Sequence, residues 1–265
     1  MIKQAEIQKV AREAGVRDTQ IEKDYVLTWI LYGISQHELL SEALTFKGGT
    51  VLKKFYFEDY RYSEDLDFTL LEESKTNEDI ETAFLEVFEF IKDEANMDLS
   101  MDDFDEHQTG NINFFINYIG PLGGRGKQVK VDISRNELLK FNLEEKHMIE
   151  VYSDQEECSL KCYSLNEVMT EKMRSLLSRV QPRDFYDLWF LSENESLEMA
   201  DLLSEYEEKA VFKGLKPETI GKRLEKILPV FEKQWETSMS DQIQDLPPFK
   251  RVERELGRHF RKFLD

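Results

Sequence analysis

The chain has 265 residues, the length of one large domain or two small ones. Apolar residues make up 40% of it and aromatic residues 12%, which suffices for a buried core and excludes a disordered or collagen-like chain. Acidic residues outnumber basic ones 54 to 35, and the net charge of −19 argues against a nucleic-acid binder and against binding to an anionic membrane.

Helices and strands are mixed in the first part of the chain. Helices are predicted where apolar side chains recur every three or four residues, and strands where polar and apolar residues alternate. The helices are expected at 1–15, at 21–35 with Thr19 as the cap, at 51–57 and at 77–94. The strands are expected at 44–46, 65–70, 97–104, 111–119, 128–134, 148–152 and 160–163.

The pattern becomes almost wholly helical after residue 163. Ser164 and Glu167 have the spacing of a capping box, which would open a helix through about residue 180. Pro182 sits where the next helix would begin. The remainder is charged helix, with interruptions expected at Gly214, Pro217, Pro229 and Pro247-Pro248.

Two features of the first part suit the binding of a nucleoside triphosphate. Gly48 and Gly49 follow the strand at 44–46, and glycines at a strand-to-helix turn let backbone N–H groups approach a phosphate closely. Asp65 and Asp67 are two residues apart on a strand, so both carboxylates project from one face. Mg²⁺ prefers one or two carboxylates together with phosphate oxygens, which makes this pair a candidate metal site.

A third carboxylate is expected from a later strand. The apolar residues Val131 and Ile133 alternate with Asp132, which places Asp132 on the opposite face, beside the aspartate pair if the two strands are adjacent. Each feature alone is common on solvated strands or in ordinary turns. Their combination in this order is the assembly that two-metal phosphoryl and nucleotidyl transfer requires.

The segment KGGTVLKKFYFEDYRYSEDLDF, residues 47–68, resembles the G-G-T…R-x-S-x-D-x-D signature of the AbiEii/AbiGii-type (MenT-like) nucleotidyltransferases. These proteins are toxin halves of bacterial toxin–antitoxin and abortive-infection pairs within the polymerase-β-like superfamily. The resemblance continues at 21–27, at 130–134 and in an E-K…R…R-D-x-x-D pattern that ends at Asp187. It covers about residues 20–191, and no motif is visible beyond them.

The resemblance implies an α+β fold, with a polymerase-β-like core built on a mixed sheet flanked by helices and followed by a C-terminal helical domain. We therefore expect a nucleotidyltransferase domain with N-terminal helices at 1–163. A helical domain at 164–265 is expected to complete the active-site cleft.

The resemblance also implies roles for individual residues. The residues that it implies for nucleotide binding are Lys47, Gly48, Gly49, Thr50, Ser63, Lys172 and Arg179. The implied ligands of the metal, Mg²⁺ or alternatively Mn²⁺, are Asp65, Asp67 and Asp132. The catalytic set is Asp65, Asp67, Lys172 and Asp187.

The position of Lys172 supports such a role without the family. At about 100° per residue, Lys172 falls within the apolar stripe of its predicted helix. A lysine on a core-facing stripe is costly unless an anion meets it. That anion is either a nucleotide phosphate or an internal carboxylate such as Asp184 or Asp187, unless the side chain snorkels to water.

By resemblance, the protein is expected to be a toxin that transfers a nucleoside monophosphate from an NTP to RNA, with the tRNA 3′ end as the favoured acceptor, so that translation stops. A cognate antitoxin is the expected partner, with a winged-helix regulator as the candidate. Two alternatives stay open. One is a degenerate fold that only binds nucleotide or a partner, and the other is an enzyme that modifies a protein.

The basic residues are clustered despite the acidic total. Arg125, Lys127 and Lys130 lie at a Gly-rich turn, and a second cluster near the C-terminus contains Lys250, Arg251, Arg254, Arg258, Arg261 and Lys262. The C-terminal cluster either lines an RNA groove, which we slightly favour, or packs on the acidic body of the protein. Two cysteines spaced C-x3-C do not indicate a zinc site, and no signal peptide or membrane span is visible, so we expect a cytoplasmic protein.

Overall fold

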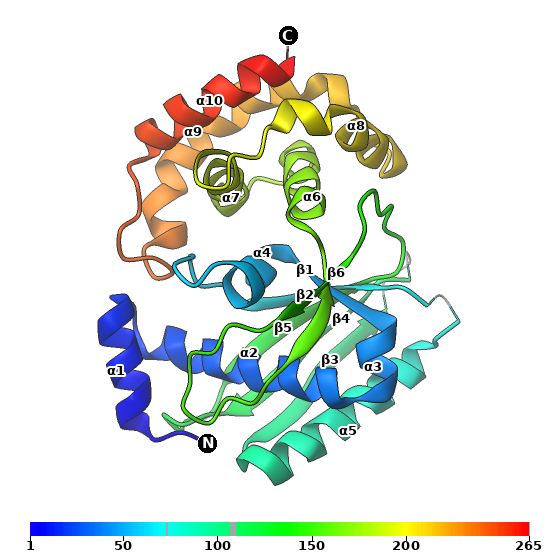
Figure 1. Cartoon of the computed structure of the whole chain (residues 1–265), viewed down its shortest axis with the longest axis vertical. Coiled ribbons are helices and arrows are strands. Elements are labelled where there is room, and N and C mark those ends of the chain that lie inside the picture. The colour runs from blue at the N-terminus through cyan, green and yellow to red at the C-terminus, as the bar shows by residue number, and fades with distance from the viewer. Residues whose placement is uncertain (73, 107–109, 265) are drawn as a thin grey trace. The chain divides into compact units, whose positions relative to one another are not determined.

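The structure is a computed structural model that describes residues 1–72, 74–106 and 110–264 (Figure 1). It divides into two compact units. The first comprises Met1–Glu137 and Leu143–Tyr163, and the second comprises Leu138–Asn142 and Ser164–Asp265. Among the described residues, no helix is long and apolar enough to cross a membrane.

The first unit contains the whole sheet. Its helices are α1 (Gln4–Ala14), α2 (Asp18–Gln36), α3 (Glu38–Ala43), α4 (Gly48–Val51), a π-helical continuation at Leu52–Tyr56, and α5 (Asn77–Ala95). Its strands are β1 (Leu44–Lys47), β2 (Asp65–Leu70), β3 (Asp98–Glu106), β4 (Ile112–Ile119), β5 (Lys127–Ser134), β6 (Glu144–His147) and β7 (Ser159–Cys162). Their order in the sheet is β3-β4-β5-β2-β1-β7-β6, with parallel pairing between β2 and β5 and between β1 and β7.

The two faces of the sheet differ because side chains alternate along each strand. One face is apolar, and its Phe114 packs edge-on against Phe84 of α5 at 5.0 Å between ring centroids. Helices α2 and α5 run along this side (Figure 1). The other side carries Asp65, Asp67 and Asp132, all half-buried. We call this side the polar face.

The second unit is helical. Its helices are α6 (Leu165–Ser178), α7 (Pro182–Glu193), α8 (Leu203–Phe212), α9 (Ile220–Met239) and α10 (Phe249–Leu264), with short 3₁₀ turns at Met199–Leu202 and Pro217–Thr219. Phe185 of α7 lies at the centre of its core. The ring of Phe185 is 5.6 Å from Phe231 of α9 and 6.3 Å from Phe260 of α10, so one residue joins three helices.

One buried carboxylate binds Leu138–Asn142 to the second unit. Glu167 of α6 accepts hydrogen bonds from the backbone N–H groups of Lys140 and Phe141, both at 2.9 Å. It also forms an ion pair with Lys209 of α8, and both side chains are buried. The predicted capping box is therefore only half formed, because Ser164 caps the helix but Glu167 turns away from it.

Three local predictions were wrong. Helix α2 begins at Asp18 without a side-chain cap, so Thr19 is not its cap. The strand expected at 148–152 lies instead at β6 (Glu144–His147), while the backbone of Ile149 donates to the carbonyl of Lys54 at 2.8 Å. Pro229 lies inside α9, whose buried stripe continues on both sides, so packing outweighs the roughly 3 kcal/mol cost of an internal proline.

Candidate functional site

The backbone of the Gly48-Gly49 turn lies in close contact with side chains of neighbouring segments. Gly48 has a φ of 81°, a left-handed conformation that favours glycine, and a methyl group there would overlap the carboxylate of Asp67. A methyl group at Gly49 would lie 2.7 Å from Nη2 of Arg61. The helix expected at 51–57 begins earlier, at Gly48. The N–H groups of the Gly-Gly turn are therefore also the first N–H groups of the helix, which have no partner within it.

The aspartates of β2 and β5 lie side by side on the polar face. In the parallel pair β2–β5, Asp67 is opposite Asp132 and Asp65 is opposite Lys130, so the two strands are adjacent, as the metal-site prediction requires. The Lys130 Nζ lies 2.7 Å from Oδ2 of Asp132. The hydroxyl of Thr50 donates to the carbonyl of Asp65 at 2.5 Å, which ties α4 to the start of β2.

The chemistry of these side chains fits Mg²⁺. Asp65 and Asp67 offer hard oxygen donors on one face, and Mg²⁺ bound to a nucleotide uses one or two carboxylates plus phosphate oxygens. Within the described residues, no three Asp, Glu, His or Cys side chains form a metal site on their own. The roles of Asp65, Asp67 and Asp132 as ligands stay predictions.

Lys47 and Ser63 lie on either side of the turn. Lys47 is only 5% exposed, and its Nζ lies 3.3 Å from Glu137 and 3.2 Å from the hydroxyl of Ser134. Ser63 is buried beside Gly49. The sequence predicted both as nucleotide-binding residues, and for Lys47 it gave no sign of the buried carboxylate partner.

Arg61 is the site residue that sequence reasoning did not single out. Its side chain is 2% exposed, and it lies under Gly49, with its guanidinium 5.6 Å from the ring of Tyr60. Its place in the R-x-S-x-D-x-D pattern was the only signal. Burial of so large a cation depends on the fold and leaves no mark in the local sequence.

The predicted residues of the second unit form one ion cluster, in which Lys172 and Asp187 are buried and Arg179 is exposed. The Nζ of Lys172 lies 2.8 Å from both Asp184 and Asp187, and Arg179 makes a two-pronged contact with Asp184 at 2.7 and 2.8 Å. Burial raises the pKa of Asp184, but Lys172 and Arg179 outweigh it and hold that pKa below its ordinary value. The internal ion pair is thus present, and the contact of Lys172 with phosphate stays a prediction.

The basic residues of α10 are largely engaged within the second unit. Arg258 pairs with Glu193 at 3.3 Å, and Lys262 pairs with Glu198 at 3.0 Å. Of the two interpretations of this segment, these pairs favour packing against acidic neighbours. An RNA groove along α10 would have to compete with them.

A family model described as the nucleotidyl transferase AbiEii toxin of a type IV toxin–antitoxin system matches residues 29–265. The chain belongs to the AbiEii family. The AbiEii assignment makes the protein a nucleotidyltransferase of a toxin–antitoxin system, with an NTP as the implied substrate and an antitoxin as the implied partner. The match extends beyond residue 191, where no motif was visible, and begins after the segment 21–27.

Solved structures confirm the AbiEii protein's fold. JHP933 from Helicobacter pylori has a TM-score of 0.62 and 15% identity over 94% of this chain and 93% of its own. A proposed nucleotidyltransferase, also from H. pylori, has a TM-score of 0.55 and 17% identity over 94% of this chain and 96% of its own. No curated protein matches the sequence. The predicted fold, a nucleotidyltransferase-like mixed sheet flanked by helices, is confirmed.

Proposed function

We propose that this AbiEii-family protein transfers a nucleoside monophosphate from an NTP to the 3′ end of an RNA, tRNA first, and thereby stops translation. The observation that carries the proposal is the pairing of Asp67 with Asp132 on the polar face, with the Gly48 backbone against the Asp67 carboxylate. The N–H groups proposed to bind phosphate and the carboxylates proposed to bind the metal are then neighbours, and nucleotidyl transfer requires such an arrangement.

Each group on the polar face has a task in this reaction. The N–H groups at Gly48 and Gly49 bind phosphate oxygens, and Asp65 and Asp67 hold Mg²⁺, which stabilises charge on the phosphates. The acceptor hydroxyl oxygen attacks the α-phosphorus, the bond to the β-phosphate breaks and pyrophosphate leaves. Asp132, the third predicted Mg²⁺ ligand, would also accept the hydroxyl proton, and Lys130 at 2.7 Å keeps that carboxylate oriented.

Lys172 and Asp187 are proposed members of the same catalytic set. Two buried carboxylates hold the ammonium of Lys172 in one position, with both distances at 2.8 Å. A cation fixed in this way is already desolvated, so a phosphate that replaces one carboxylate meets a preorganised partner.

The test is transfer itself. The purified protein is incubated with each radiolabelled NTP, Mg²⁺ and total tRNA, and the label is expected on tRNA. Asp65→Ala and Asp67→Ala should abolish labelling, whereas the exposed Asp201→Ala, the matched control, should not. Label on a protein instead would support the protein-modifying alternative, and NTP binding without transfer would support a degenerate fold; either result contradicts the RNA proposal.

A further inference from the structure

The polar face continues well past the aspartates. From Asp132, β5 leads back through Lys130 to Gln128, and the adjacent β4 brings Phe115 opposite Lys130 and Asn117 opposite Gln128. The amide of Gln128 donates to Asn117 at 3.0 Å. Four residues of strand span roughly 13 Å, so this strip is long enough to seat more than one nucleotide.

Phe115 places an aromatic ring in the middle of this polar strip. Its neighbours along β4, Phe114 and Ile116, are fully buried on the apolar face, whereas Phe115 is only partly buried. A partly exposed aromatic ring on an open sheet face is how sheet-based RNA-binding modules stack bases of a single strand.

The Gly-rich turn between β4 and β5 is built to present Arg125. Buried Glu22 of α2 accepts from the backbone N–H of Leu122 at 2.7 Å and from Lys127 Nζ at 2.5 Å, which fixes both ends of the turn. Arg125 lies between them, exposed and in no ion pair within the described part of the chain. A methyl group at Gly126 would meet no atom within 4 Å, so the turn is open to solvent at the residue after Arg125.

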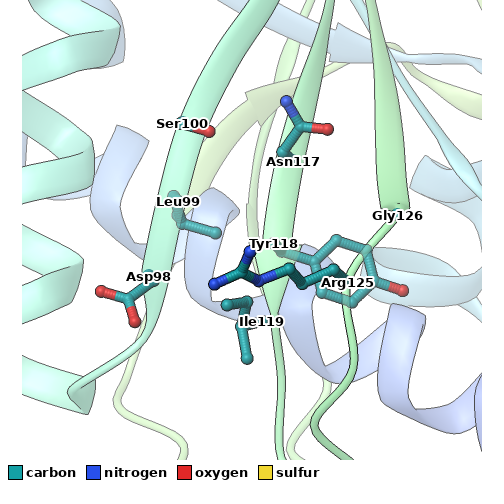
Figure 2. A pocket seen from close by; sticks show the side chains of 8 residues that line it. All are labelled: Asp98, Leu99, Ser100, Asn117, Tyr118, Ile119, Arg125 and Gly126. Carbon is teal, nitrogen blue, oxygen red and sulfur yellow. The ribbon is translucent and has the colours of Figure 1, made fainter.

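A pocket of about 340 Å³ lies where the strip meets this turn. Ser100, Asn117, Ile119 and Arg125 contribute to its lining. Figure 2 shows the Arg125 side chain reaching from the turn across β4 toward β3. Asp98 also lines the pocket, which therefore combines a guanidinium and a carboxylate with an amide and an apolar side chain. The guanidinium suits a phosphate, the amide a base edge, and the apolar side chain a sugar or base face.

We propose that the strip from Asp132 to Arg125 binds the last nucleotides of a single-stranded RNA acceptor. Phe115 stacks on a base, Asn117 and Gln128 hydrogen-bond to base edges, and Arg125 binds a backbone phosphate. This inference rests on the proposed function, because the strip leads directly to the carboxylates where the terminal hydroxyl reacts. Two exposed acids of β3 lie directly beside the strip: Asp102 is opposite Phe115 and accepts from the amide of Asn117 at 3.4 Å, and Asp98 is opposite Ile119. These carboxylates repel phosphate, which confines the RNA backbone to the β4 and β5 side of the strip.

The test measures RNA and NTP binding separately. The probe is a fluorescent six-nucleotide RNA with a free 3′ hydroxyl, followed by anisotropy, and NTP binding is measured by calorimetry. Phe115→Ala and Arg125→Ala should each weaken RNA binding by about 5- to 100-fold and leave the NTP affinity unchanged. Phe115→Tyr should keep RNA binding, and Arg12→Ala, an exposed arginine on α1, is the matched control.

Salt dependence separates the two roles. Arg125→Ala should reduce the slope of log K against log salt by about 0.7, because one phosphate contact is lost, whereas Phe115→Ala should leave the slope unchanged. Normal RNA binding by both variants, in a protein that still labels RNA, overturns this inference alone. Failure of the unmodified protein to label RNA overturns the proposed function and this inference with it.

Discussion

Several charged side chains in this protein are buried beside a group of opposite charge. Asp24 accepts hydrogen bonds from Lys54 at 2.5 Å and from Tyr152 at 2.7 Å, and burial lowers the pKa of Lys54. Removing one member of such a pair leaves an uncompensated buried charge, which typically costs 3–5 kcal/mol. The free energy of unfolding therefore depends on the charge of each of these buried residues.

Asp184→Asn tests this link in the Lys172 cluster. We expect a loss of roughly 1–3 kcal/mol in the free energy of unfolding at pH 7, because hydrogen bonds to a charged carboxylate are weakened while Lys172 keeps Asp187 as a partner and the exposed Arg179 stays solvated. The folded state holds the pKa of Asp184 below its ordinary value, so this contribution is present above about pH 4 and is lost as the pH falls further. Urea unfolding at pH 7 and pH 3 should therefore show the difference from the unmodified protein shrinking in acid. A difference independent of pH would contradict the ion pair.

The cysteines give a second residue-scale prediction. Burial raises the pKa of Cys158 to about 11, and burial also raises the pKa of Cys162. Because the thiolate is the nucleophile, both thiols should resist iodoacetamide at pH 8 in the native protein and react fully in urea. Mass spectrometry of the alkylated protein checks this, and rapid labelling of the native protein would refute it.

At the scale of elements, the junction of β1 and α4 depends on Gly48. Gly48→Ala should abolish nucleotidyl transfer, because the new methyl group would displace the Asp67 carboxylate. Gly214→Ala is the matched control, since Gly214 has a φ of 70° but no atom within 4 Å of an added methyl group. Both variants carry the left-handed backbone strain of roughly 1–2 kcal/mol, and only one moves the carboxylate. Transfer assays and thermal melting separate the effects, and an active Gly48→Ala protein would refute this role of the glycine.

Sequence reasoning succeeded where a local pattern decides the structure. Helix α5 and strands β4 and β5 follow their periodicities closely, and Asp132 was correctly placed on the face opposite Val131. The prediction failed where a residue far away in the sequence determines the position of a side chain. The pairing of Lys47 with Glu137 spans 90 residues, and nothing near Glu167 indicates that its carboxylate binds a loop rather than its own helix end.

At the scale of the whole molecule, the net charge of −19 acts against compactness. Salt shortens the range of this repulsion, with a Debye length of about 30 Å at 0.01 M and about 8 Å at 0.15 M. We expect the melting temperature to rise by a few degrees between these ionic strengths, measured in KCl with a neutral osmolyte as the control. A fall would mean that favourable ion pairs outweigh the general repulsion.

The segment Leu138–Asn142 is held by residues that are synthesised after it, which affects when it can fold. This segment leaves the ribosome before Glu167 and Lys209, whose contacts with it span up to 71 residues. Translation proceeds at roughly 5–20 residues per second, so Lys209, the last residue to contact this segment, is synthesised several seconds after it. A chain cut after Tyr163 would keep the loop and lose both side chains that hold it. Deletion experiments that separate the two units should therefore transplant 138–142 with the helices.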